Sequence, residues 1–261
     1  MVITSKDNDF VKHVKKLKEK KYREEYGEFI VEGIKMIEEA ISEQAKIKQV
    51  VVCEDCKNSG GIPKELLYEI AKYDCVYVSE KVFTQMTDVS NPQGILAIID
   101  KSANQEAEID YKAEIILVLD NIQDPGNMGT ILRTADSINL KQIIVSKGSS
   151  DVYNPKVVRS TMGAIFRVKV IECEDLGKTI KELKKHKINI FATDLKTDKS
   201  IYDVDYKKSA IVIGNEANGV SNNILELADT RIKIPMIGKT ESLNAAVATS
   251  IILYEAIRPN R

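Results

Sequence analysis

The sequence predicts an α/β protein in two parts, and three observations carry that prediction. From Glu114 onward, short apolar segments rich in β-branched residues alternate with helix-like segments, which is typical of a mostly parallel sheet covered on both faces. The first hundred residues show the same kinds of segment on a smaller scale. Between these parts, KSANQEAEIDYK is polar and weakly periodic, as linkers are. We therefore expect a small α/β domain at 1–100, a linker at 101–112 and a larger domain at 113–261.

The first domain is expected to begin with a basic amphipathic helix whose buried stripe is Val11, Val14 and Leu17. A second helix is expected in EGIKMIEEAIS. The runs IKQVVVC, CVYVS and GILAIID are short and rich in β-branched residues, which predicts three strands, and a helix near 65–72 separates the first two of them. These segments are sufficient for a self-contained α/β domain.

Six strands are predicted in the second domain, because six short runs there are apolar and mostly β-branched: EIILVLD, QIIVS, FRVKVIE, INIFATD, AIVIG and RIKIP. Helices are expected from about Met128, near Pro155, in the lysine-rich stretch before INIFATD, and in AVATSIILYEAI. Six strands are too few for an eight-stranded barrel. Ligands of open parallel sheets bind at the carboxyl ends of the strands, so a functional site is expected in the loops that follow them.

Composition excludes several classes of protein. With 43% hydrophobic and 30% charged residues, the chain is typical of a soluble globular protein, and it has no apolar run near the roughly 18 residues that cross a bilayer. Its first residues do not resemble a secretory signal, so we expect a cytoplasmic protein. Four cysteines are too few for a disulfide scaffold. Cys53 and Cys56 have the spacing of half a zinc site, but His13 and His186 are distant in sequence. We therefore expect no metal and interpret the pair as a strand end running into a loop.

The formal net charge of −1 hides a basic N-terminal segment. Residues 1–23 contain eight basic residues against three acidic ones, and such a local excess can contact an RNA phosphate backbone. The alternative is that the lysines are simply the solvated face of an amphipathic helix. If the segment binds RNA, the expected contacts are Lys12, Lys15, Lys16, Lys20 and Arg23.

Three strand-end loops of the second domain have unusual content, and the first is NIQDPGNMGTILR at 121–133. Its proline and glycines permit a tight turn, and Asn127 can hold that turn or a substrate. Arg133 follows Asn127 by about one and a half helical turns, so we expect both side chains to point into one cleft. Taken alone, the loop could equally be an ordinary strand-to-helix turn followed by a solvated arginine.

The other two loops follow the last two predicted strands. In GNEANGVS at 214–221, Glu216 lies among small residues just beyond an apolar strand, where a carboxylate can reach a cleft. A surface loop with an Asn-Gly turn is the alternative. In IPMIGKTESLNAA at 234–246, Ser242 or Asn244 can cap the final helix. A capping role does not exclude a functional one.

Taken together and in this order, NIQDPGNMGTILRTADS, IVIGNEANGVS and IPMIGKTESLNAAVATSIILYEA closely resemble the three motifs of the SpoU (TrmH) family of RNA 2′-O-ribose methyltransferases. The resemblance covers residues 115–261. The first hundred residues resemble, more loosely, the substrate-binding domain of the same family, which is similar to ribosomal protein L30e. The resemblance implies a parallel α/β sheet whose C-terminal segment is threaded into a deep trefoil knot, although general rules of chain connectivity disfavour knots.

The same resemblance implies roles for particular positions. The family's motif residues fall on Asn127, Arg133, Glu216, Ser242 and Asn244, with no substitution at any of them. S-adenosyl-L-methionine is implied as the cofactor, bound by the knotted loops largely through backbone groups, and a homodimer is implied that packs the last helix. The positions implied in cofactor binding are Thr193, Asp194, Gly214, Asn215, Glu216, Ile234, Met236, Ser242 and Leu243.

The implied chemistry depends mainly on positioning. A sulfonium methyl is already activated, and alignment can supply roughly 7–11 kcal/mol, whereas a positioned base typically adds about 10²- to 10⁴-fold. No histidine lies in the three motifs, which leaves Arg133 or Glu216 to manage the hydroxyl proton. The family's proposal makes the arginine a base, but a guanidinium stays protonated near neutral pH. We hypothesise that Arg133 contacts the target phosphate and the incipient alkoxide, oriented by Glu216 and Asn127.

Two alternatives stay open at this point. A noncatalytic RNA-binding protein with the same fold would not bind S-adenosylmethionine, and a tRNA base methyltransferase would place the methyl group on a base rather than on a ribose. The three motifs favour ribose methylation. The N-terminal domain favours ribosomal RNA, specifically 23S rRNA, over tRNA, by analogy of fold rather than through any feature of the site.

Overall fold

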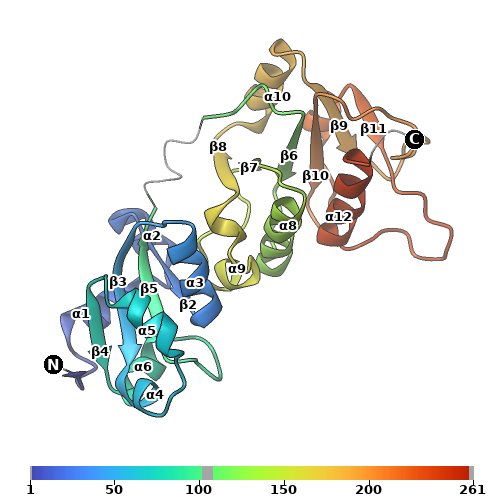
Figure 1. The fold of residues 1–261 in the computed structure, drawn as a ribbon. Coiled ribbons are helices and arrows are strands. Elements are labelled where there is room, and N and C mark those ends of the chain that lie inside the picture. The colour runs from blue at the N-terminus through green and yellow to red at the C-terminus, as the bar shows by residue number, and fades with distance from the viewer. Residues whose placement is uncertain (1, 102–107, 259–261) are drawn as a thin grey trace. The chain divides into compact units, whose positions relative to one another are not determined.

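A computed structural model describes residues 2–101 and 108–258, which fall into two units. The N-terminal unit contains residues 2–101 and 153–166, and the C-terminal unit contains residues 108–152 and 167–258. Each unit is built around its own sheet (Figure 1). No helix within the described residues is long and apolar enough to cross a membrane.

The N-terminal unit has a five-stranded sheet in the order β1-β4-β3-β5-β2. Its first three strands are parallel, whereas β5 runs antiparallel to β3 and β2. The sequence does not predict two of the strands. β1 (Val2–Ile3) has only two residues, and β2 (Glu28–Glu32) has four of its five residues buried. Neither shows the alternation of a half-buried strand. The predicted strands are β3 (Ile47–Cys53), β4 (Cys75–Val78) and β5 (Ile95–Asp100).

The expected basic helix is two short helices, α1 (Asp9–Lys16) and α2 (Lys20–Tyr26). Val11, Val14 and Leu17 are fully buried, as predicted, and they pack against α6. The other helices of this unit are α3 (Ile34–Ser42), α4 (Glu54–Asn58), α5 (Lys64–Ile70), α6 (Glu80–Met86) and, from the later segment, α9 (Pro155–Ser160).

Arg23 is not available to RNA, and its predicted contact is wrong. The residue is only 2% exposed, and its Nη1 donates hydrogen bonds to the carbonyl oxygens of Leu17 (2.8 Å) and Lys18 (2.7 Å). These carbonyls lie between the end of α1 and the start of α2, where the last carbonyls of a helix have no backbone N–H partner. The buried guanidinium supplies the hydrogen bonds that these two groups lack. The other four predicted RNA contacts are exposed lysines, and their role stays a prediction.

The C-terminal unit confirms the predicted parallel sheet. Its six strands lie in the order β11-β9-β10-β6-β7-β8, and every neighbouring pair is parallel. The first strand of this unit, β6, lies in the middle of the sheet. β7 and β8 follow on one side of it, and β9, β10 and β11 lie on the other side. The strand order therefore switches between β6 and β10, and ligands of such sheets bind at this switch point. The strands are β6 (Ile115–Asp120), β7 (Gln142–Ser146), β8 (Lys169–Cys173), β9 (Asn189–Thr193), β10 (Ser209–Gly214) and β11 (Thr230–Ile232).

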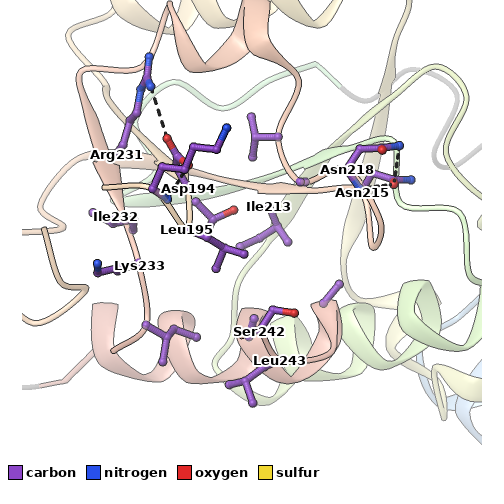
Figure 2. Close-up of a pocket in the computed structure, with 18 of the residues that line it drawn as sticks. Asp194, Leu195, Ile213, Asn215, Asn218, Arg231, Ile232, Lys233, Ser242 and Leu243 are labelled. Carbon is purple, nitrogen blue, oxygen red and sulfur yellow. Dashed lines mark hydrogen bonds and ion pairs between the residues drawn. The ribbon is translucent and has the colours of Figure 1, made fainter. Parts of the chain in front are cut away.

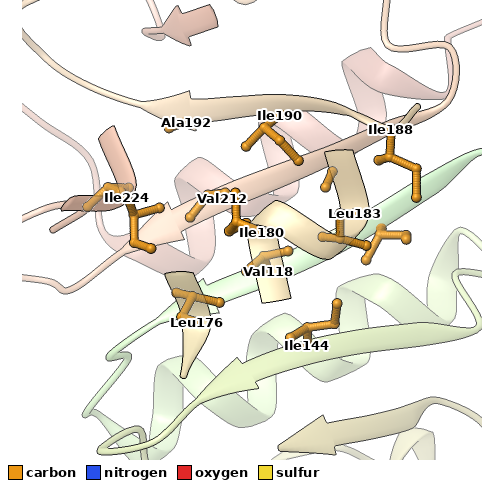
Figure 3. Close-up of a cluster of buried hydrophobic side chains, with 13 residues drawn as sticks. Val118, Ile144, Leu176, Ile180, Leu183, Ile188, Ile190, Ala192, Val212 and Ile224 are labelled. Atoms are coloured by element: carbon orange, nitrogen blue, oxygen red, sulfur yellow. The ribbon is translucent and has the colours of Figure 1, made fainter. Parts of the chain in front are cut away.

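Helices pack on the two faces of this sheet. On one face, α10 (Leu176–Lys185) and α11 (Asn222–Leu225) cover a cluster in which Ile180 meets strand residues such as Val118 and Val212 (Figure 3). Since successive strand residues point to opposite faces, their neighbours Leu117, Leu119, Ile211 and Ile213 are left to the other face. There α8 (Pro125–Ser137) and α12 (Ala245–Ala256) lie side by side.

Two stretches differ from the predicted domain boundaries. Most of the expected linker, residues 102–107, lies outside the described residues, but residues 108–112 belong to the C-terminal unit. There the backbone of Asp110 exchanges two hydrogen bonds with the Gln142 side chain, at 2.9 and 2.7 Å. The segment 153–166 belongs instead to the N-terminal unit, where Tyr153 packs its ring against Phe29 at 4.8 Å.

Candidate active site

The loops that follow β6 and β10 meet at the carboxyl ends of these neighbouring strands, and Glu216 joins them. Its Oε1 accepts hydrogen bonds from the Asn127 side chain (2.9 Å) and the Asp124 backbone N–H (3.1 Å), and its Oε2 accepts one from the Gln123 backbone N–H (3.2 Å). These donors lie at the entry to α8. One carboxylate therefore ties the second predicted loop to the first.

Asn244 adds the third loop to the same network. Its Nδ2 donates to Asn127 Oδ1 at 2.9 Å, while its Oδ1 accepts from the backbone N–H groups of Ala246 (2.9 Å) and Val247 (3.3 Å). Asn244 is thus the N-cap of α12, as predicted, and its amide nitrogen remains free to bind Asn127. A chain of hydrogen bonds, Glu216–Asn127–Asn244, connects all three loops.

The environment of Glu216 favours its ionised form. Partial burial by itself raises the pKa of the carboxyl, but the hydrogen bonds from Asn127 and from backbone N–H groups outweigh it, so the pKa lies below its ordinary value. A carboxylate with both oxygens engaged by donors is a weak proton acceptor. Glu216 is therefore suited to positioning Asn127 rather than to acting as a general base.

Further residues at these strand ends support the loops, and two of them, Asp120 and Ser221, were not predicted from the sequence as functional. Asp120 Oδ2 accepts hydrogen bonds from the backbone N–H (2.8 Å) and the hydroxyl (2.7 Å) of Ser221, and Asn215 Nδ2 donates to the Asn121 carbonyl oxygen at 2.9 Å. Asn121 itself has a φ of 60°, which asparagine tolerates better than most residues. An aspartate ending an otherwise apolar strand is the signal that could have identified Asp120.

A cavity of about 390 Å³ opens beside this network, at the ends of β9, β10 and β11. Figure 2 shows Asp194 and Leu195 after β9, Asn215 and Asn218 after β10, and Ser242 and Leu243 before α12. All nine positions that the resemblance implies in cofactor binding line this one cavity: Thr193, Asp194, Gly214, Asn215, Glu216, Ile234, Met236, Ser242 and Leu243.

Gly214, at the end of β10, has no room for a side chain. A Cβ atom there would lie 2.0 Å from both the carbonyl carbon of Gly219 and the nitrogen of Val220. Those are backbone atoms, which cannot rotate away. The close approach lets residues 215–219 fold back on the strand end and form one wall of the cavity.

The cavity wall is mixed in character. Apolar side chains such as Ile213, Leu243 and Met236 contribute to it, and Asp194 is held at the rim by Arg231, 3.4 Å away (Figure 2). A mostly apolar cavity with a few fixed polar groups is typical of small-molecule sites.

Arg133 lies apart from this network. It is exposed on α8 and, with hydroxyl side chains, lines a separate hollow of about 340 Å³ formed by Thr130, Arg133, Thr134, Ser137, Ser250 and Tyr254. Among the described residues no hydrogen bond joins it to Asn127 or Glu216. The expectation that Asn127 and Arg133 share a cleft is therefore wrong within one chain, because six residues rotate about 240° around a helix.

The cysteine pair lies at a strand end. Cys53 is buried at the end of β3, and the backbone N–H of Cys56 donates to its Sγ at 3.4 Å, so the pair marks a strand end running into the short helix α4 rather than a loop. Burial, the largest cause, and the neighbouring Cys53 raise the pKa of Cys56 to about 12. Within residues 2–101 and 108–258, no three His, Cys, Asp or Glu side chains are grouped to hold a metal ion.

Comparison with known proteins agrees with this geometry. The chain matches the SpoU rRNA Methylase family over residues 114–254 and the MRM3-like substrate binding domain over residues 8–97. It belongs to the SpoU rRNA methylase family.

Relatives cover nearly the whole chain. The 23S rRNA (guanosine(2553)-2′-O)-methyltransferase RlmP of Bacillus subtilis is 34% identical over 97% of both chains. The AdoMet-bound rRNA methyltransferase from Sinorhizobium meliloti is 29% identical, with a TM-score of 0.84 over 99% of this chain and 97% of its own. The SpoU methyltransferase AviRb from Streptomyces viridochromogenes, solved in complex with AdoMet, is 26% identical, with a TM-score of 0.87 over 96% and 97%.

Proposed function

We propose that this protein transfers the methyl group of S-adenosyl-L-methionine to a ribose 2′-hydroxyl in structured RNA, with 23S ribosomal RNA favoured over tRNA. One observation carries the proposal: the Glu216–Asn127–Asn244 chain joins the three family motifs beside a cavity that all nine implied cofactor positions line. The relative RlmP, named for 2′-O-methylation of 23S rRNA, supports the substrate class. A cytoplasmic location is proposed together with this function.

The cavity suits the proposed cofactor. Its volume of about 390 Å³ lies in the range of small-molecule sites, and its apolar wall can cover an adenine ring while Asp194 and Ser242 offer partners for hydroxyl and amino groups. Backbone groups of residues 214–219 are brought to the wall by the close packing at Gly214. The bound cofactor supplies a methyl group already activated by a positively charged sulfur.

The protein's own contribution is then chiefly positioning. Asn127 is fixed from both ends of its amide, by Glu216 and by Asn244, so its orientation does not have to be selected when RNA binds. Alignment of this kind can contribute several kcal/mol, and misplacement by about 1 Å can cost about 10²-fold in rate. Glu216 and Asn244 act as positioning residues in this scheme.

Arg133 is proposed to contact the target phosphate. Its positive charge would also stabilise the negative charge that develops on the 2′-oxygen. A guanidinium has five N–H donors and does not lose its proton in proteins, so Arg133 is not the base in this scheme, and the proton of the 2′-hydroxyl passes to a solvent water. The hydroxyls of Thr134 and Ser250, which bond each other at 3.0 Å in the same hollow, give the surface around Arg133 a polar character suited to phosphate. Among the described residues of one chain no hydrogen bond joins Glu216 to Arg133, so the orienting role proposed here for Glu216 is toward Asn127.

A homodimer through α12 is also proposed. Val247, Tyr254 and Ile257 on and just after this helix are 42–53% exposed, which is unusual for large apolar side chains lying close together on one helix. Tyr254 also lines the hollow that contains Arg133. A second copy packed on α12 would therefore border the surface where Arg133 lies.

The deep trefoil knot implied by the family is proposed for the C-terminal unit. Its support is that five residues of the segment between β11 and α12 line the same cavity as the loops after β9 and β10: Lys233, Ile234, Met236, Ser242 and Leu243. Stretching the chain by its ends in an optical trap tests it. An open chain extends to about 3.3–3.6 Å per residue. A knotted chain tightens around its knot and should reach a shorter extended length than this.

The function itself is tested in two steps. Isothermal titration with S-adenosylmethionine is expected to show binding, and the absence of binding would favour a noncatalytic RNA-binding protein. Incubation with the cofactor and unmodified 23S rRNA transcribed in vitro is then expected to yield a 2′-O-methylated nucleoside on digestion and mass spectrometry. A methyl group on a base, or methylation of tRNA alone, would overturn the proposal.

A further inference from the structure

The N-terminal unit carries an aromatic and basic surface that the methyltransferase site does not use. We define the α1–α2 patch as Tyr22, Tyr26, Lys16 and Lys21. The tyrosine rings are half-buried and stacked, with centroids 6.0 Å apart and planes inclined by 16°. The ammonium groups of Lys16 and Lys21 lie over the Tyr22 ring, 5.2 and 5.5 Å from its centroid, on flexible side chains that a stacking base can displace toward its phosphates.

This patch is held in place by contacts that reach the sheet. Tyr26 packs against the imidazole of His13, with ring centroids 4.9 Å apart. His13 Nε2 lies 2.7 Å from Glu28 Oε2, and Lys48 donates to Glu28 Oε1 at 2.8 Å. Glu28 is buried on β2. The Tyr22 ring is therefore preorganised, which lowers the entropy that a stacking ligand would have to overcome.

The cations of the patch have no carboxylate partner in the part of the chain that the structure describes. Lys16 and Lys21, like neighbouring Lys15, are exposed and have no ion pair within the described residues. Lys12 and Lys20, by contrast, are paired with nearby carboxylates. An aromatic ring flanked by unpaired lysines is the combination that binds single-stranded nucleic acid, because the ring stacks on a base and the lysines meet phosphates.

We propose that the α1–α2 patch binds an unpaired nucleotide of the RNA substrate, with its base stacked on Tyr22 and the flanking phosphates contacted by Lys16 and Lys21. This inference rests on the proposed function, and it specifies an unpaired nucleotide as the part of the RNA that the N-terminal unit recognises. Unpaired bases in loops and bulges can stack on a protein ring, whereas paired bases within a duplex cannot. The match to a substrate binding domain over residues 8–97 includes the whole patch.

The stack is tested with Tyr22→Ala. Filter binding to 23S rRNA transcribed in vitro is expected to weaken by about 5- to 150-fold, the range for one base–aromatic stack, while Tyr22→Phe keeps the ring and binds like wild type. Tyr68→Ala is the matched control, since Tyr68 is 78% exposed in the same unit and outside the patch. Circular dichroism and thermal unfolding establish that each variant is folded.

The lysines are tested separately, with the ring in place. Each phosphate contact to a single strand contributes about 0.7 to the slope of log affinity against log salt, so the double variant Lys16→Ala, Lys21→Ala is expected to flatten that slope by about 1.4. Lys72→Ala is its control, because Lys72 is exposed in the same unit but paired with Glu69 at 2.6 Å. This test stands even if Tyr22→Ala does not fold.

Photocross-linking locates the contact directly. With 23S rRNA containing 4-thiouridine, a cross-linked peptide that includes Tyr22 is expected after nuclease and protease digestion. Wild-type affinity of Tyr22→Ala, or cross-links confined to other peptides, would overturn the proposal. Lysine effects on RNA affinity without any ring effect would also overturn it, because they would leave only electrostatic contact with RNA phosphates and no stacked base.

Failure of the patch and failure of the proposed function give different results. If the patch alone is misassigned, the wild-type protein still methylates 23S rRNA, and Tyr22→Ala does so with an unchanged KM for RNA. If the function is misassigned, the wild-type protein binds no S-adenosylmethionine and leaves the RNA unmodified. The proposal itself expects a raised KM for RNA with kcat unchanged at saturating RNA.

Discussion

Among single residues, Glu216 shows why a motif position and its role are separate questions. The sequence places a carboxylate just beyond an apolar strand, and it does lie at the cavity. The sequence could not show that both oxygens are occupied by donors from the loop after β6, because those donors lie about ninety residues earlier in the chain. The role that we propose for Glu216 is therefore that of a positioning residue rather than a proton acceptor.

Glu216→Gln is therefore expected to lower the methylation rate by about 10²-fold through misplacement of Asn127, with the affinity for S-adenosylmethionine less affected. An amide replaces one acceptor oxygen with a donor, so at least one of the three hydrogen bonds is lost. Single-turnover methylation of 23S rRNA measures the rate. Glu241→Gln, an exposed carboxyl in the loop before α12 with no hydrogen bond among the described residues, should leave it unchanged.

The same variant has a pH signature. The folded-state pKa of Glu216 is lowered from an ordinary value of 4.5, so its ionised form stabilises the fold above pH 4.5, and this contribution is lost as pH falls through the folded-state pKa. The difference in Tm between wild type and Glu216→Gln should thus be present at pH 7 and shrink as the pH falls below 4.5. The effect is small because the residue is exposed. A difference that grows on acidification would contradict the assignment.

The motif position identified Arg133, but the sequence did not correctly predict which residues lie around its side chain. Arg133→Ala is expected to abolish methylation while leaving the affinity for S-adenosylmethionine within about twofold, because the residue lines a hollow separate from the cofactor cavity. Loss of a charge-assisted contact to a developing charge commonly costs about 10²- to 10³-fold. Arg133→Lys should retain part of the rate, since a positive charge remains. Turnover like that of wild type in the alanine variant would exclude the role.

At the scale of elements, short buried strands and local turns set the limit of prediction. The six strands of the C-terminal unit were predicted because each is a β-branched run between helix-like segments, and the structure confirms them. β2 was missed because its apolar run is only three residues, Phe29 to Val31, between the charged Glu28 and Glu32. Helix α8 begins three residues earlier than expected, at Pro125, because Asp124 caps it through the Asn127 N–H at 2.8 Å.

The turn at Gly214 gives an element-scale prediction. Gly214→Ala would place a methyl group 2.0 Å from backbone atoms of residues 219 and 220, so the loop after β10 has to move. We expect the affinity for S-adenosylmethionine to fall by about 100-fold or more and the Tm to fall by several degrees, on the order of 2–4 °C per kcal/mol. Titration calorimetry and thermal unfolding measure these changes.

Gly238→Ala is the matched control for this prediction. Gly238 lies in the loop between β11 and α12, near residues that line the same cavity, but a Cβ there would meet nothing within 4 Å. The control should bind and unfold like wild type. Equal effects of the two substitutions would mean that glycine is needed at both positions for flexibility rather than at Gly214 for space.

For the whole molecule, the division into units could be predicted only approximately. Composition located the boundary near residues 101–112 because polar segments without periodicity join domains. It could not reveal that residues 153–166 leave the C-terminal unit, because this segment has buried residues such as Val157 and Val158 and looks like any other helix of an alternating pattern. Which core a helix joins depends on tertiary packing, and a single sequence does not record that.

Assembly is the remaining question at this scale, and α12 is where it is expected to be answered. Large apolar side chains exposed on one helix cost free energy in water, at roughly 25 cal/mol per Å² of apolar surface, so a second copy of α12 is the proposed cover. Tyr254→Glu would place a charge in that interface, and burial of an unpaired charge is strongly unfavourable. Light scattering coupled to size-exclusion chromatography is expected to give a dimer for the wild-type protein and a monomer for this variant. Tyr202→Glu, at a 54% exposed tyrosine away from α12, should remain dimeric. A monomeric wild-type protein would leave the exposed face of α12 unexplained and would remove the dimer from the proposed mechanism.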